Sequence, residues 1–316
     1  MVPATPLLAA RGSLAAVGLV APADPAAVRA LEDLGVASLW VGGHVASPNP
    51  TPEAMVWLAR LVEQTDRAVV GTATLLLPLF PPAVVAKQVA DLDRAAGGRV
   101  ALGIGVGGEY ASDFEACGVP IEERGSRANE AMPLLRAFWT GAPVTHHGRH
   151  WTFDGLRIHP PPAQPGGPPI VVTGRQPVAM RRAARLGDGW MPYLYSPERY
   201  LRSVATIREE AETIGRTLEA FTWCAYVFVC MDDDGDAART NAAQALGGTY
   251  RNDFSEMIDR VAAVGTAEHV AARLAAFVAA GVEHFVLCPL GPNADETARR
   301  LLTEIAPILD RGRVDG

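Results

Sequence analysis

His44 is the residue of this sequence best placed for proton chemistry. It follows the short apolar run Ser38–Val41 and the pair Gly42–Gly43. An imidazole at the end of a buried strand can take or give a proton near neutral pH. We therefore predict that His44 is catalytic, and the alternative is a loop histidine that only packs.

A glycine-rich segment supplies the next candidate residues. Gly105, Val106 and Gly107 follow the apolar run 100–104 and add little side-chain bulk, so a planar cofactor could lie against the main chain there. Glu109 comes two residues later, and its carboxylate is the second predicted catalytic group. A tight turn and a solvated loop carboxylate are the alternatives for this segment.

Phosphate binding is expected at Thr173, Gly174, Arg175 and Gln176, which precede a predicted helix over 177–186. Backbone N–H groups at a helix start bind phosphate, and a hydroxyl group and a guanidinium strengthen such a site. The alternative for Arg175 is a surface salt bridge. Trp190 ends the following predicted strand and is predicted to line the substrate pocket, with a core tryptophan as the alternative.

The histidines and cysteines do not predict a metal site. His146, His147 and His150 lie close together, but no carboxylate or cysteine shares their segment at helical spacing, and the pattern favours a polar hairpin. The cysteines show no Cys-x-x-Cys spacing and are expected to be buried thiols. They are Cys117, Cys224, Cys230 and Cys288.

The scaffold predicted for these residues is an α/β fold, a (β/α)8 barrel. Short β-rich runs alternate with helical patterns, as the barrel requires. The strands are predicted at 15–20, 37–41, 68–75, 100–105, 169–173, 188–192, 222–230 and 283–288. This alternation favours a closed parallel barrel over an open doubly wound sheet, although the strand count alone leaves both open.

Glycine and proline mark the predicted element boundaries. Helical patterns run through glycine into a strand at 29–41, 90–104, 181–191 and 275–287, and glycine suits the left-handed position after a helix. Capping side chains precede proline at three predicted helix starts, Asp24–Pro25, Thr51–Pro52 and Ser196–Pro197. Apolar residues at helical spacing predict core faces, including a final stripe of Leu301, Ile305, Ile308 and Leu309.

The chain is predicted to be one domain over residues 1–316, with insertions at about 105–168 and 232–265. Because the first insertion is too long for a single connection, it is expected to hold a helix near 122–140 and a two-stranded excursion around 147–153. The second insertion precedes the last strand–helix repeat.

The composition of the chain argues against two classes of binding partner, nucleic acids and membranes. The formal net charge is −7, and the basic residues form no stripe that could neutralise a phosphate backbone, so nucleic acid is not expected as a partner. No apolar run reaches membrane-spanning length, and the first 21 residues lack the pattern of a signal peptide. We expect a cytoplasmic protein without membrane contact.

Several strings together resemble a known family. The chain over about residues 14–310 resembles the luciferase-like monooxygenase superfamily of flavin-dependent oxidoreductases, and it is most similar to actinobacterial members that use the deazaflavin coenzyme F420. The strings that carry the resemblance, in order, are SLWVGGH at 38–44, GTATL at 71–75, GRVALGIGVG at 98–107 and PIVVTGR at 169–175.

The resemblance has consequences for particular residues. It implies that His44 lies beside the cofactor ring and that Ala73–Thr74 is a non-proline cis peptide under that ring. The sequence departs from the family at Gly42–Gly43, where relatives commonly have an acidic residue just before the histidine. This departure puts in doubt an acid–base mechanism transferred unchanged from the family.

The function expected from the sequence is hydride transfer between coenzyme F420 and a small organic substrate. The alternatives are an FMNH2-dependent monooxygenase supplied by a separate reductase, and a non-catalytic flavin-binding protein. The partner expected is a small-molecule substrate, and a homodimer is left open.

Overall fold

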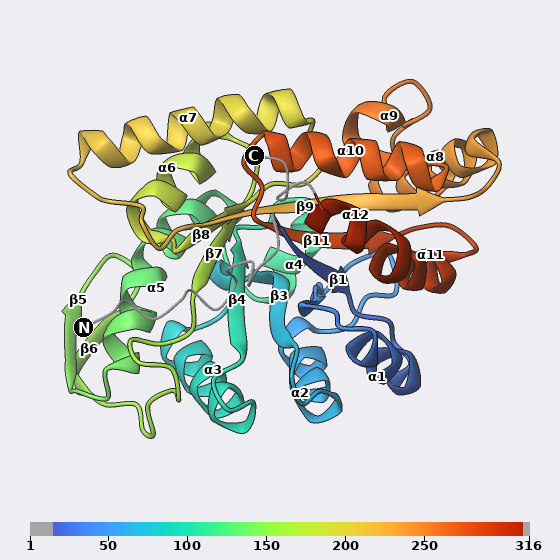
Figure 1. The fold of residues 1–316 in the computed structure, drawn as a ribbon. Coiled ribbons are helices and arrows are strands. Elements are labelled where there is room, and N and C mark those ends of the chain that lie inside the picture. The colour runs from blue at the N-terminus through green and yellow to red at the C-terminus, as the bar shows by residue number, and fades with distance from the viewer. Residues whose placement is uncertain (1–14, 312–316) are drawn as a thin grey trace. The chain divides into compact units, whose positions relative to one another are not determined.

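The computed structural model describes residues 15–311, and within them the chain folds as a (β/α)8 barrel (Figure 1). The hydrogen-bonded order is β10-β9-β11-β1-β2-β3-β4-β7-β8, and β8 also pairs with β9. The predicted fold class is therefore confirmed. The barrel strands are β1 (Ala16–Val20), β2 (Ser38–Val41), β3 (Val69–Leu76), β4 (Val100–Gly105), β7 (Ile170–Thr173), β8 (Gly189–Met191), β9 (Thr222–Met231) and β11 (His284–Pro289).

Two compact units can be distinguished by their internal contacts. One is Val41–Val172, and the other combines the chain up to Trp40 with the chain from Thr173 onward. We call them the central unit and the terminal unit and describe each by itself. The predicted single domain over 1–316 stays a prediction.

The central unit contains the parallel strands β3, β4 and β7. The insertion after β4 holds a helix and the antiparallel hairpin β5–β6, as predicted, and also the short helix α4, which was not predicted. The elements besides the barrel strands are α2 (Ala54–Gln64), η1 (Leu77–Leu79), α3 (Pro82–Ala95), α4 (Ala111–Ala116), η2 (Ile121–Glu123), α5 (Arg124–Trp139), β5 (Val144–His147) and β6 (Thr152–Leu156).

The terminal unit contains the other barrel strands, with β1 between β2 and β11, and β9 paired with β8 and β11. An additional short strand, β10 (Ala262–Gly265), pairs with β9 inside the predicted second insertion. The helices are α1 (Pro25–Asp33), α6 (Pro177–Leu186), α7 (Pro197–Thr213), α8 (Gly235–Tyr250), α9 (Ile258–Val261), α10 (Ala267–Ala279), α11 (Ala294–Arg300), the π-helical turn η3 (Leu301–Ile305) and α12 (Ala306–Arg311).

The predicted helix starts are confirmed at Asp24 and Ser196, whose side chains accept a backbone N–H from the first turn. The start at Thr51–Pro52 is wrong, because α2 begins at Ala54 and the Glu53 carboxylate accepts the Val56 N–H at 2.8 Å. Glu53, two residues after Thr51, is thus the N-cap residue, and Pro52 lies outside the helix.

Two further details correct the sequence prediction. Gly35, Gly98 and Gly281 have positive φ after their helices, but Gly187 has φ −90° and is extended. In the C-terminal stripe Leu301, Ile305 and Leu309 are buried, whereas Ile308 is 48% exposed. The η3 turn winds more widely than an α-helix, which shifts the position that faces the core.

The cysteines are free thiols. Cys224 and Cys230 are buried as expected, whereas Cys117 and Cys288 are only partly buried. Among residues 15–311, no helix combines the length and apolar character needed to cross a membrane.

Candidate functional site

His44 is held by a buried carboxylate from the insertion after β4. Its Nδ1 lies 2.8 Å from Oδ2 of Asp113, which is on α4 and is 1% exposed. Asp113 Oδ1 accepts the backbone N–H groups of Val45 and Ala46, each at 2.8 Å. The carboxylate therefore fixes both the imidazole ring and the backbone that follows it.

The remaining surroundings of His44 leave part of the ring accessible. The ring packs edge-on against Tyr110, with centroids 4.9 Å apart, and the His44 side chain is 21% exposed. His44 also borders a recess whose other lining residues are mainly apolar: Gly43, Val45, Glu53, Ala54, Leu75, Leu76, Leu79 and Phe80. Such a partly exposed, hydrogen-bonded imidazole can exchange a proton with a small molecule.

The geometry explains why glycine precedes His44. A Cβ at Gly42 would lie 2.7 Å from the Ala73 carbonyl oxygen, and one at Gly43 would overlap the Pro52 carbonyl oxygen. Neither position has room for an acidic side chain. The carboxylate near the histidine comes instead from Asp113, about seventy residues later in the chain.

Sequence reasoning missed Asp113. The absence of an acidic residue just before His44 could have indicated a partner elsewhere in the chain, because a hydrogen bond to one ring nitrogen sets the protonation of the other. Asp113 directly precedes Phe114 in the insertion, but its contact with His44 depends on the turn that α4 makes after β4. The spacing in the sequence does not show that turn.

Ala73 and Thr74 lie at the carboxyl end of β3 and are joined by a cis peptide, as the resemblance implied. The pairing of β3 with β4 is irregular between Thr72 and Leu75. The hydroxyl groups of Thr72 and Thr74 both donate to the Gly103 carbonyl, at 2.8 and 3.0 Å, and so hold β3 against β4 across this irregularity.

The loop after β4 contains the glycines predicted to let a planar cofactor lie against the main chain, and that role stays a prediction. Gly107 and Gly108 have φ of +68° and +111°, where a residue with a Cβ would be strained. Val106 and Gly107 are partly buried and Glu109 is exposed. The predicted catalytic role of Glu109 stays a prediction.

The predicted phosphate residues lie in the terminal unit, at the end of β7 and the start of α6. Gly174 has φ +125°, and a Cβ there would lie 2.9 Å from Cβ of Ala179, so this corner requires glycine. Gln176 is the N-cap residue of α6 and its side chain makes no capping hydrogen bond. The chain therefore turns sharply into the helix, with Arg175 at the corner.

Arg175 is in contact with a second arginine, Arg199. The Arg175 guanidinium lies 5.1 Å from the centroid of the Tyr193 ring, and the Arg175 carbonyl oxygen accepts an N–H from Arg199 at 3.2 Å. The Arg199 guanidinium packs over Tyr195 at 4.3 Å. Sequence reasoning missed Arg199 because it lies on α7, far from the motif in the chain. The two arginines thus bring two positive charges to this end of the terminal unit, and its role as a phosphate site stays a prediction.

Trp190 is a core residue, which was the alternative interpretation of the sequence. It is fully buried, its ring packs against Tyr195 and Tyr200, and its indole N–H donates to the Gly174 carbonyl at 2.9 Å. Its structural effect is to hold the corner at which Arg175 begins.

The histidine-rich segment forms a polar hairpin whose histidines contact carboxylates. His146 lies 3.0 Å from Glu130, and His147 lies 3.0 Å from Asp154. His150 lies 2.9 Å from Ser126 and 3.5 Å from a Glu123 oxygen. Over residues 15–311, no group of three histidine, cysteine or acidic side chains is arranged to hold a metal ion.

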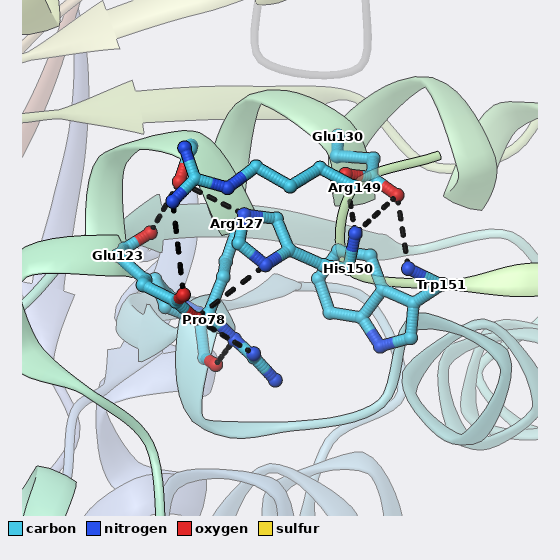
Figure 2. Close-up of polar contacts among 8 residues, drawn as sticks. Pro78, Glu123, Arg127, Glu130, Arg149, His150 and Trp151 are labelled. Carbon is cyan, nitrogen blue, oxygen red and sulfur yellow. Dashed lines mark hydrogen bonds and ion pairs between the residues drawn. The ribbon is translucent and has the colours of Figure 1, made fainter. Parts of the chain in front are cut away.

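Glu130 is the central anchor of this hairpin (Figure 2). Its carboxylate on α5 accepts the backbone N–H groups of His150 and Trp151 at 3.1 Å as well as contacting His146. Nearby, Arg127 packs over the Trp151 ring and donates to the Pro78 carbonyl. These contacts hold the hairpin and η1 against α5. The polar groups of the cluster therefore stabilise the fold of the insertion.

We expect Glu130→Gln to reduce the free energy of unfolding by about 1–3 kcal/mol at neutral pH, because charge-assisted hydrogen bonds are lost. Burial raises the pKa of the Glu130 carboxyl, but the hydrogen bonds from His146, Trp151 and His150 outweigh burial and leave it below its ordinary value of 4.5. The stabilisation by the charge is therefore complete above about pH 4.5 and is lost as the pH falls through the lowered folded-state pKa.

Urea unfolding of both proteins across this pH range checks the prediction. Asp154→Asn, on the same hairpin and in an exposed ion pair, serves as the control and should change stability by less than about 1 kcal/mol. An equal stability of Glu130→Gln and the unchanged protein at pH 7 would show that Glu130 is not the anchor.

Comparison with known proteins decides the family. The model of the luciferase-like monooxygenase family matches residues 23–284, which is most of the chain. The chain belongs to the luciferase-like monooxygenase family. In this chain His44 follows β2, and the carboxylate beside it comes from α4.

Among relatives of this luciferase-like protein, an uncharacterised protein of Mycobacterium tuberculosis is 37% identical over 168 residues, which are 53% of this chain and 57% of that protein. The F420-dependent glucose-6-phosphate dehydrogenase of Amycolatopsis mediterranei is 28% identical over 314 residues, covering 89% of this chain and 90% of that protein. The matched region thus spans little more than half of the Mycobacterium relative and nearly all of the Amycolatopsis enzyme.

A solved structure shares the fold over nearly its whole length. It is an F420-dependent secondary alcohol dehydrogenase in complex with an F420-acetone adduct, with a TM-score of 0.82 at 20% identity. The match covers 93% of this luciferase-like chain and 99% of that chain. At this identity the likeness concerns the fold.

Proposed function

We propose that this luciferase-like protein is an F420-dependent oxidoreductase that transfers a hydride between the deazaflavin and a small organic substrate. The observation that carries the proposal is the pairing of His44 with buried Asp113 beside a mainly apolar recess. The F420-dependent dehydrogenase of Amycolatopsis mediterranei, which matches along nearly the whole chain, supports the choice of cofactor.

The residues present fit a cofactor with a planar ring and a phosphate. In the central unit, Ala73, Thr74 and the segment Gly105–Gly107 offer main chain with little side-chain bulk, which suits the ring. In the terminal unit, Thr173–Gln176 at the start of α6, with Arg199, offer the charges and N–H groups that suit a phosphate. When bound, F420 would supply a carbon centre that accepts or gives a hydride.

The protein's own contribution to the reaction is proton transfer and positioning. A hydroxyl compound oxidised to a carbonyl loses one hydride from carbon and one proton from oxygen. We assign the proton to Nε2 of His44, since Nδ1 is occupied by Asp113. In the reverse direction the same nitrogen returns the proton to the carbonyl oxygen. Glu109, at the rim after β4, is a second candidate for contact with substrate.

Titration with F420 and with FMN, followed by intrinsic tryptophan fluorescence, tests the choice of cofactor. We expect F420 to bind with micromolar or better affinity and FMN at least about tenfold more weakly, a difference of roughly 1.4 kcal/mol. Equal affinities or tighter binding of FMN would favour the alternative, an FMNH2-dependent monooxygenase supplied by a separate reductase. Stoichiometric binding of F420 without turnover of any acceptor would instead favour a non-catalytic flavin-binding protein.

A further inference from the structure

We infer that Asp113 is a positioning residue that sets the tautomer of His44 and thereby makes Nε2 the reactive nitrogen. The inference about the tautomer concerns the protein alone. Its consequence for the reaction rests on the proposed function. No acidic residue adjoins His44 in the sequence, so this role falls to a side chain on α4.

The three hydrogen bonds of Asp113 divide between its two oxygens. Oδ2 meets His44 Nδ1 at 2.8 Å, and Oδ1 accepts the N–H groups of Val45 and Ala46, the two residues that follow the histidine. The edge-on contact with Tyr110 restrains the ring from another side. The ring is thus held at Nδ1 while part of the side chain remains exposed.

The chemistry of the carboxylate determines the tautomer. A carboxylate has no proton to give, so Nδ1 must be the donor in this hydrogen bond. In the neutral imidazole only one nitrogen carries a proton, and Nε2 is then the acceptor. This is the form that can take a proton from a bound substrate.

Asp113→Asn should invert this arrangement without dismantling the loop. The remaining amide oxygen can still accept the N–H groups of Val45 and Ala46, while the amide nitrogen replaces the oxygen that faces His44. An amide nitrogen is a donor only, so Nδ1 becomes the acceptor and the proton moves to Nε2. A merely structural role of Asp113 predicts no such change at the far nitrogen.

The test is nitrogen-15 NMR of histidine-labelled protein at a pH where the ring is neutral, with His44→Gln used to assign the His44 signals. We expect the unchanged protein to carry the proton on Nδ1 and Asp113→Asn to carry it on Nε2. Glu115→Gln, an exposed carboxylate on the same helix, is the matched control and should leave the His44 tautomer unchanged.

Two results would overturn the inference: a proton on Nε2 in the unchanged protein, or the same tautomer in Asp113→Asn. The folded state of the variant is checked by its circular dichroism spectrum and its urea unfolding curve, and its F420 affinity should stay within about threefold of that of the unchanged protein, a difference of less than 1 kcal/mol. The NMR signals are read without cofactor, so a failure of F420 to bind would contradict the proposed function and leave the tautomer result standing.

Discussion

His44→Ala is expected to lower turnover by about 10² or more, the low end of what a positioned acid or base contributes. Its F420 affinity is expected to stay within a few-fold, because the role assigned to His44 is to exchange a proton with the substrate, whereas the phosphate contacts are assigned to Thr173–Gln176. Turnover and a fluorescence titration of the same preparations measure the two quantities.

His44→Gln separates proton transfer from positioning. Glutamine keeps a hydrogen-bonding side chain but does not titrate near neutral pH. If both variants are equally slow, proton transfer is the role of His44, and if glutamine restores most of the rate, the residue only positions the substrate. His147→Gln, on the exposed face of the hairpin, is the control and should turn over at the normal rate. An unchanged rate in both His44 variants would mean that His44 only packs in its loop.

Arg175→Ala is expected to weaken F420 binding by about 1–3 kcal/mol, roughly five- to 150-fold, because a charge-assisted contact to phosphate is lost. The Arg175 guanidinium packs over Tyr193, and the partly buried residue lies two positions before α6 begins. Fluorescence titration with F420 measures the loss.

The matched control for Arg175 is Arg185→Ala. Arg185 lies on α6, the helix that follows Arg175, is exposed and pairs with Glu210, so its removal should leave F420 affinity nearly unchanged. If Arg175→Ala binds F420 as tightly as the unchanged protein, the phosphate lies elsewhere. A large loss in Arg199→Ala alone would place the main phosphate contact on α7.

The barrel could be predicted from the sequence because its determinants are local. Buried parallel strands read as short apolar runs, and Asp24–Pro25 and Ser196–Pro197 mark helix starts through contacts within one turn. The predicted start of α2 at Thr51–Pro52 was wrong, because the Glu53 side chain caps this helix instead. It also missed β10, a four-residue strand whose pairing with β9 depends on tertiary contact.

The candidate site could be predicted only in part. His44 and the corner around Gly174 follow strand ends, and strand ends are visible in the sequence. Asp113 and Arg199 were missed because each reaches its partner from a helix that is distant in the chain, and no local pattern records that approach. Trp190 was ambiguous because apolar runs do not distinguish a pocket wall from the core.

Hydride exchange between F420 and a small organic substrate can be followed without oxygen. The F420-loaded protein is incubated anaerobically with a panel of small alcohols, and the visible absorbance of the oxidised deazaflavin is recorded. We predict that at least one alcohol bleaches this absorbance without oxygen and that His44→Ala slows the bleaching by about 10² or more. Turnover that requires both oxygen and FMNH2, with no reaction of F420 under any condition, would contradict the proposed function.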